Sequence, residues 1–92
     1  MEEIIKVSIC IITYNQELYI EQAIKGALEQ KTNFLFEIVI SDDRSTDSTP
    51  EICKEYAERY PELVRFIHQK QNLGTGKHWI AALQECRGKY VA

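Results

Sequence analysis

Apolar positions along this chain switch between two spacings. A continuous apolar run of strand length, residues 7–12, is rich in β-branched side chains, as a strand buried on both faces requires. The next segment carries an apolar stripe at three- and four-residue spacing, which is typical of an amphipathic helix and consists of Tyr19, Ile20, Ala23, Ile24, Ala27 and Leu28. Lys31-Thr32-Asn33 interrupts that stripe. This part of the chain therefore predicts a strand followed by a helix.

The alternation then repeats. A second apolar strand is predicted over about residues 36–41, and an acidic loop follows it. Thr49 is suited to be the N-cap of the next helix, with Pro50 at its first position. The apolar face of this second helix consists of Ile52, Cys53, Tyr56, Ala57 and Tyr60, and Pro61 ends it.

The last part of the chain predicts a third strand at residues 64–68 and a third helix that closes at Gly88. The apolar positions of this helix are Trp79, Ala82, Leu83 and Cys86. Residues 89–92 begin a fourth strand, so the order is β-α-β-α-β-α-β. Strands and helices that alternate in this way specify an α/β fold, here a three-layer, Rossmann-like parallel sheet with helices on both faces.

Two adjacent carboxylates stand at the mouth of the second predicted strand, in the loop from Ser41 to Asp47. Ligands of open α/β folds bind at the carboxyl ends of the strands, where Asp42 and Asp43 could accept hydrogen bonds from the ribose hydroxyls or base N–H groups of a nucleotide. Asp, Ser and Thr also cap helices, so an acidic turn that caps the following helix is an equally good interpretation. The loop by itself leaves both readings open.

Composition limits which binding partners and which cellular compartment we expect. The chain has 92 residues and a net charge of −3, which gives no electrostatic reason to expect nucleic acid or an anionic membrane as a partner. No run approaches the roughly 18 apolar residues of a membrane span. Met1-Glu2-Glu3 is acidic where a signal peptide is basic, so we expect a location in the cytoplasm or on the cytoplasmic face of a membrane. Cys10, Cys53 and Cys86 lack C-x-x-C spacing and are predicted to be buried free thiols.

Loop chemistry separates the nucleotide-binding folds that share this order of elements. The turn at residues 13–17 contains no glycine, whereas a dinucleotide-binding Rossmann domain needs glycines directly after its first strand. Residues 74–78 imitate the end of a phosphate-binding P-loop, but Gln71 replaces the leading glycine and His78 the hydroxyl residue. A phospho-receiver domain would need an aspartate at the end of the third strand, which here reads His68-Gln69-Lys70.

Five short motifs in fixed order nevertheless carry a family resemblance over nearly the whole chain. They run from Val7 to Asn15, Ala27 to Gln30, Glu37 to Asp47, Asn72 to Gly74 and Gly88 to Ala92. In this order and spacing they resemble the nucleotide-binding half of a family 2 glycosyltransferase of the GT-A fold. The resemblance implies an enzyme that transfers a sugar from a nucleoside-diphosphate sugar, with a UDP-sugar expected, to a glycan or other hydroxyl acceptor with inversion. Its products would be polysaccharides or cell-surface glycans.

The resemblance also implies roles for residues of the first strand's turn. Tyr14 matches the aromatic residue that packs against the base of the donor, and its flat apolar face suits that contact. Thr13 and Asn15 would hold the turn. Glu17 matches a position that reaches the uridine ribose, although a carboxylate near a helix N-terminus is also favoured by the helix dipole.

Further roles fall on the acidic loop and the third helix. Asp43 matches the aspartate that accepts the uracil N3–H, whereas Asp42 is suited to bind backbone N–H groups of its own turn. Lys77 and His78 open the third helix, and Lys77 is a candidate contact to the diphosphate. Many relatives carry an Arg-Asn pair one turn into this helix, where this chain has Trp79-Ile80, and Trp79 is better explained as a core residue.

The resemblance places the remaining chemistry beyond Ala92. Family members hold a divalent metal, Mg²⁺ or Mn²⁺, through an acidic motif just after the strand that begins at Gly88, and a carboxylate base lies further on. We therefore expect a single incomplete domain over residues 1–92 that binds nucleotide and is inactive alone, the acceptor contacting the missing half. Its exposed sheet surface is expected to favour self-association. A non-catalytic nucleotide-binding or interaction module of the same topology is the alternative.

Overall fold

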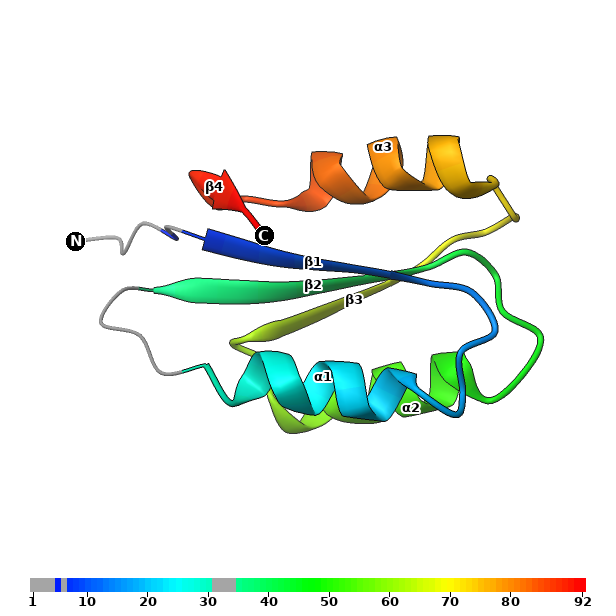
Figure 1. Ribbon diagram of the computed structural model, residues 1–92, viewed down its shortest axis with the longest axis horizontal. Coiled ribbons are helices and arrows are strands. Elements are labelled where there is room, and N and C mark those ends of the chain that lie inside the picture. The colour runs from blue at the N-terminus through cyan, green and yellow to red at the C-terminus, as the bar shows by residue number, and fades with distance from the viewer. Residues whose placement is uncertain (1–4, 6, 31–34) are drawn as a thin grey trace.

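A computed structural model describes residue 5 and residues 7–30 and 35–92 of the chain. Strands and helices alternate along the whole sequence (Figure 1). The elements are β1 (Val7–Thr13), α1 (Ile20–Leu28), β2 (Phe36–Asp42), α2 (Thr49–Arg59), β3 (Val64–His68), α3 (Thr75–Glu85) and β4 (Tyr90–Val91). The predicted order of elements is thereby confirmed.

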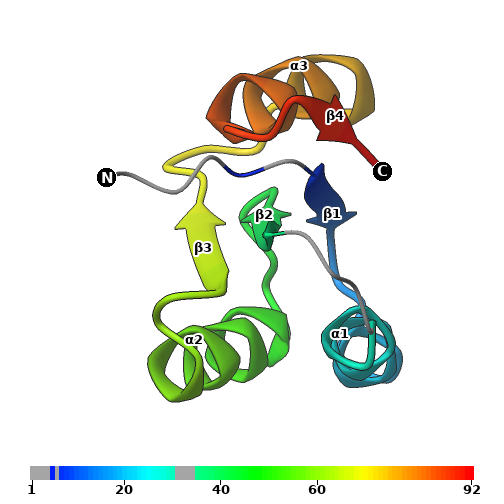
Figure 2. The same ribbon diagram turned by 90° about the vertical axis from the view of Figure 1, so that its left-hand side faces the viewer.

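The strands form one parallel sheet in the order β3-β2-β1-β4. Helices α1 and α2 cover one face of this sheet and α3 covers the other, so the molecule has three layers (Figure 2). The predicted three-layer parallel sheet is therefore correct. Because all strands are parallel, the carboxyl ends of β1 and β2 meet at one edge, with Thr13 opposite Asp42 in the register.

The main apolar core lies between the sheet and the pair α1 and α2. Its buried members are Ile20, Ile24, Ala27, Ile38, Ile40, Cys53, Tyr56 and Val64. The face under α3 differs, because several of its buried positions on the sheet are polar. Ser8, Glu37 and Ser41 are buried there beside the apolar Val39, and each polar side chain has hydrogen-bond partners. The polar positions within two otherwise apolar strands thus mark the α3 side of the sheet.

Helix boundaries differ from the prediction at the start of α2 and at both ends of α3, which ends at Glu85 rather than at Gly88. Thr49 is the first residue of α2 rather than its N-cap, which is Ser48. The carboxylate of Asp47 accepts the Thr49 N–H at 2.9 Å, so the acidic loop does provide a cap, from a different residue. Helix α3 begins at Thr75, before Lys77, and its N-cap Gly74 has a φ of +81°.

The buried side of α3 was also assigned wrongly from the sequence. Trp79 was predicted to be a core residue, yet it is 41% exposed. Ala82 is buried as predicted, and the other buried residue of this helix is His78. The error arises because Trp79 and Leu83 are more apolar than His78, which favoured them for the buried side, although they are 41% and 45% exposed.

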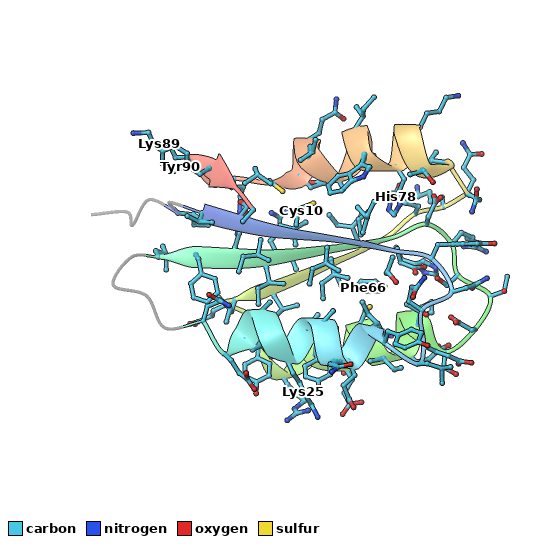
Figure 3. All side chains as sticks on the ribbon, viewed as in Figure 1. Cys10, Lys25, Phe66, His78, Lys89 and Tyr90 are labelled. Carbon is cyan, nitrogen blue, oxygen red and sulfur yellow. The ribbon has the colours of Figure 1, made fainter. Side chains whose placement is uncertain are left out.

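The cysteines are free thiols, as predicted, but only one is fully buried. Cys53 lies in the core, whereas Cys10 and Cys86 are half-buried on the α3 side of the sheet, where Figure 3 labels Cys10. Burial raises the pKa of the Cys53 thiol to about 12. Burial and the neighbouring Cys86 thiol raise the pKa of Cys10 to about 12. The thiols of Cys10 and Cys53 therefore remain protonated at neutral pH.

Two sequence observations fall outside the described residues, namely the break at 31–33 and the acidic segment 1–3. Within the described part, α1 ends at Leu28. None of the helices described has the length and apolar character needed to cross a bilayer.

Candidate functional site

A hollow of about 370 Å³ opens where β1 and β2 end and α3 begins. Its walls come from three parts of the chain that are far apart in sequence. They are Ile12, Thr13, Tyr14 and Gln16 after β1, Asp43 after β2, and Asn72, Gly74, Thr75 and His78 around the start of α3. This is the edge of an open parallel sheet at which ligands of α/β folds bind.

Asp43 joins two of these walls. Its carboxylate oxygens accept the backbone N–H groups of Leu73 at 2.7 Å and Gly74 at 3.0 Å, and the side-chain amide of Asn72 donates to its carbonyl at 3.0 Å. The residue is only 4% exposed and lines the hollow. Each carboxylate oxygen can accept more than one hydrogen bond, so Asp43 keeps acceptor capacity for a ligand.

Thr13 and Tyr14 form the β1 side of the hollow. The carbonyl of Thr13 accepts the Asp43 N–H at 3.0 Å, which extends the pairing of β1 and β2 into the site. The Thr13 hydroxyl is buried and has no hydrogen-bond partner within the described part of the chain. Tyr14 is 46% exposed, so its ring is available to a ligand.

Asn15 and its neighbours bind the first loop to the second. Asn15 has a φ of +51°, and its side-chain carbonyl accepts the Thr46 N–H at 2.8 Å. The Gln16 N–H donates to the Thr49 hydroxyl at 2.9 Å. Glu17 continues this contact, because its carboxylate accepts the Ser48 N–H at 2.9 Å. Asn15 thus holds the turn, and Glu17 reaches the start of α2 rather than the lining of the hollow.

Asp42 lies under the second loop and is fully buried. Its carboxylate accepts the Ser45 N–H at 2.8 Å and the Ser45 hydroxyl, and lies 3.5 Å from Nε2 of His68. These contacts are those of a residue that shapes its own turn. Lys77 is exposed in the first turn of α3 and does not line the hollow.

His78 is a site residue to which the sequence analysis gave no role of its own. It is 3% exposed, lines the hollow and lies between α3 and the sheet (Figure 3). Its Nε2 is 2.8 Å from the hydroxyl of Ser41, which also accepts a hydrogen bond from the Gln69 amide at 3.1 Å. The signal that could have found it is Ser41, a polar residue in an otherwise apolar strand that needs a polar partner.

Glu37 forms a second polar centre on this face, at the other end of β2. Its carboxylate accepts hydrogen bonds from the Ser8 hydroxyl at 2.6 Å, the Arg87 N–H at 2.7 Å and the Arg65 guanidinium at 3.2 Å. Burial raises the pKa of this carboxyl, but these hydrogen bonds outweigh burial and hold the pKa below its ordinary value. Glu37 therefore remains ionised and joins β1, β2, β3 and the segment after α3.

The described residues do not make a metal site. No three His, Cys, Asp or Glu side chains converge to hold an ion in the part of the chain that the structure describes. Asp43 is the carboxylate that lines the hollow, and it accepts the N–H groups of Leu73 and Gly74, whereas Asp42 accepts the Ser45 N–H of its own turn.

Comparison with known families matches residues 8–92 to the family described as Glycosyl transferase family 2. The chain belongs to this family. Chondroitin synthase of Escherichia coli is 44% identical over 85 residues, which are 92% of this chain and 12% of that protein. This member of family 2 thus spans a small part of the length of that relative.

Two solved structures have the same arrangement of elements. The mannosyltransferase PcManGT from Pyrobaculum calidifontis, in complex with GDP-Man and Mn²⁺, superposes with a TM-score of 0.81 at 27% identity over 94% of this chain and 26% of its own. TarS 1-349 of S. aureus in complex with UDP gives a TM-score of 0.79 at 33% identity, covering 95% of this chain and 26% of its own. The family 2 chain therefore has the GT-A fold of these enzymes.

Proposed function

We propose that this chain provides the donor-binding part of an inverting glycosyltransferase that uses a nucleoside-diphosphate sugar, specifically a UDP-sugar. The observation that carries the proposal is the hollow at the ends of β1 and β2, which combines the exposed ring of Tyr14 with the carboxylate of Asp43. An aromatic face and a hydrogen-bond acceptor are together what a planar base with an N–H group needs.

Asp43 has the position and the chemistry for the N3–H of uracil. It is held by Leu73 and Gly74, so its carboxylate is already oriented before a ligand arrives. A preorganised acceptor loses little conformational entropy on binding. Tyr14 would stack on the base, whereas Asn15 and Asp42 support the loops on either side, and Thr13 joins the two strands next to the base.

The related proteins support a role in glycan synthesis. Chondroitin synthase, TarS with UDP and PcManGT with GDP-Man all match over nearly the whole of this chain. We propose that the acceptor is a glycan hydroxyl, and that Glu17 and Lys77 are secondary contacts to the ribose and the diphosphate. A divalent metal, Mg²⁺ or Mn²⁺, and the carboxylate base are expected beyond Ala92, so the chain by itself should bind nucleotide without transferring sugar.

Titration calorimetry tests the base contact directly. UDP should bind the chain, and N3-methyl-UDP, which lacks the N3–H, should lose about 1–3 kcal/mol of binding free energy because the Asp43 carboxylate loses the hydrogen bond from the base. In Asp43→Ala the two nucleotides should bind equally weakly. Glu58→Gln, which changes an exposed glutamate of α2, should bind like the unaltered chain.

Equal affinity of the unaltered chain for UDP and N3-methyl-UDP would contradict the Asp43 contact. Failure of UDP to bind at any accessible concentration would favour the interaction module of the same topology. Melting temperatures of each variant show whether a loss of affinity reflects a loss of folding, because Asp43 also holds Leu73 and Gly74.

A further inference from the structure

His78 has features of a ligand contact that its place in the helix does not explain. It is a buried polar side chain in the first turns of α3, and a buried polar group without partners is costly. One ring nitrogen, Nε2, is satisfied by Ser41. The other, Nδ1, has no hydrogen-bond partner among the described residues. It is not fully buried, so a ligand in the hollow could reach it.

The burial of the Ser41 hydroxyl indicates which ring nitrogen of His78 carries the proton. The Ser41 hydroxyl is fully buried, so its proton needs an acceptor, and the Gln69 amide is present only as a donor to the Ser41 oxygen. Nε2 of His78, at 2.8 Å, is the acceptor in reach. A neutral imidazole that accepts at Nε2 carries its proton at Nδ1. The hollow is therefore lined by an N–H donor as well as by the acceptor Asp43.

We infer that His78 reads the base of the donor nucleotide, donating its Nδ1–H to the carbonyl oxygen beside the N–H that Asp43 accepts. The inference rests on the proposed nucleotide-binding function and adds a second recognition contact to it. Acceptor and donor come from the ends of two different elements, β2 and α3, and both are positioned by internal hydrogen bonds.

This pair of groups selects between bases. Uracil presents an N–H between two carbonyl oxygens, so it satisfies both Asp43 and His78. Cytosine has an unprotonated N3, which would face the carboxylate without a proton between them. Guanine also places an N–H beside a carbonyl, so the pair distinguishes uracil and guanine from cytosine and adenine. A site built to hydrogen-bond a group discriminates strongly against an analogue that lacks it.

Thio-substituted nucleotides test this contact without changing the protein. Binding of UDP, 2-thio-UDP and 4-thio-UDP is measured by calorimetry, because sulfur is a much weaker acceptor than the carbonyl oxygen it replaces. One of the two thio analogues should bind the unaltered chain about fivefold to tenfold more weakly than UDP. CDP should bind more weakly than either.

Variants of His78 then assign the effect. In His78→Leu the penalty for the thio analogue should disappear, and UDP should bind as weakly as that analogue binds the unaltered chain. His78→Asn should retain most of the affinity, since its carboxamide offers an N–H close to the position of Nδ1. Ile80→Ala, on the exposed side of the same helix, is the matched control and should bind like the unaltered chain.

Two results would overturn the inference. One is equal binding of UDP and both thio analogues to the unaltered chain, and the other is a thio penalty that persists in His78→Leu. If His78→Leu does not fold, the inference is still tested by the binding of the thio analogues to the unaltered chain and by the affinity of His78→Asn for UDP. If GDP binds and UDP does not, the UDP assignment fails and 6-thio-GDP replaces the uracil analogues; if neither binds, both proposals fail.

Discussion

Glu37 is the single residue on which the α3 face of the sheet most depends. Its side chain is buried, and its donors come from β1, β3 and the segment after α3. Arg65 extends the contact by donating to the carbonyl of Glu85 at 2.7 Å. Removing such an acceptor leaves several donors unsatisfied at once, and a buried donor without a partner costs more than the hydrogen bond was worth.

Glu37→Gln should therefore lower the free energy of unfolding at pH 7 by about 1–3 kcal/mol, as measured by urea denaturation. The amide keeps the size of the side chain but replaces one acceptor by a donor that faces Ser8 and the Arg87 N–H. Because the pKa of Glu37 is lowered by folding, its contribution is present above the ordinary carboxyl value of 4.5. The contribution is lost as the pH falls below that value, so the variant and the unaltered chain should converge in acid.

Glu58→Gln removes the same charge from an exposed position of α2 and serves as the control. Its unfolding free energy should match that of the unaltered chain within about 0.5 kcal/mol across the pH range. A Glu37→Gln deficit that stays constant down to pH 3 would contradict the linkage to ionisation of this carboxyl.

Some residues of the site could be predicted from the sequence and others could not. Asp43 could be predicted because it follows an apolar strand directly, and the carboxyl end of a strand is where α/β folds bind ligands. His78 could not, because its role depends on Ser41 and Gln69, which lie far away in sequence and meet it only in the fold. Glu17 could be placed in the right loop, but its contact with Ser48 depends on how two loops pack.

At the scale of elements, the position of β4 beside β1 depends on a close approach of backbone to backbone. Gly88 precedes β4 and lies against Ser8, and a Cβ atom added to it would meet the Ser8 nitrogen at 2.5 Å. The Gly88 N–H donates to the Ser8 hydroxyl at 2.7 Å, so the same two residues are also hydrogen-bonded. No side chain can be added here without moving β4 away from β1.

Gly88→Ala should therefore destabilise the chain by about 1–3 kcal/mol, as expected for overpacking, and weaken the pairing of β4 with β1. Gly26→Ala is the matched control, because a Cβ atom at this position of α1 meets nothing within 4 Å. That change should stabilise the chain by about 0.5–1 kcal/mol, since alanine favours a helix more than glycine does. Thermal unfolding of both variants gives the comparison, and equal effects of the two would contradict it.

Strands and the first two helices could be predicted because each has one apolar pattern that no alternative matches. Helix α3 is different, because the predicted apolar positions 79, 82 and 83 belong to two overlapping stripes, at 78 and 82 and at 79 and 83, of which only the first is buried. The more apolar stripe is the more exposed one, so hydrophobicity alone found Ala82 but missed His78. The buried His78 contacts Ser41 of β2, and this contact between distant residues cannot be predicted from the sequence pattern of the helix alone.

At the scale of the whole molecule, α3 presents an apolar stripe to solvent, defined by Trp79, Ile80 and Leu83. These side chains are 41%, 60% and 45% exposed, and they are neighbours at helical spacing. Tyr90 and Val91 of β4 are exposed as well. Apolar surface of this kind favours association with another surface.

We expect the chain to self-associate through this stripe as its concentration is raised. Static light scattering should show an apparent mass that increases with concentration, and Leu83→Glu should reduce the increase by placing a charge in the contact. Leu18→Glu should leave it unchanged, because this residue is 82% exposed and directly precedes α1, the helix that lies on the other face of the sheet from α3. A constant monomer mass for the unaltered chain up to millimolar concentration would rule the association out.

The sheet order β3-β2-β1-β4 also separates the chain into early and late parts during folding. β1 pairs with β2 after one intervening helix, but with β4 only after two further helices and another strand have been made. Closing the longer loop costs more chain entropy, so β1, β2 and β3 with α1 and α2 can assemble first and α3 with β4 can dock afterwards. His78 belongs to the late part and Asp43 to the early part. A ligand bound between them would therefore join the part of the chain that folds first to the part that docks last.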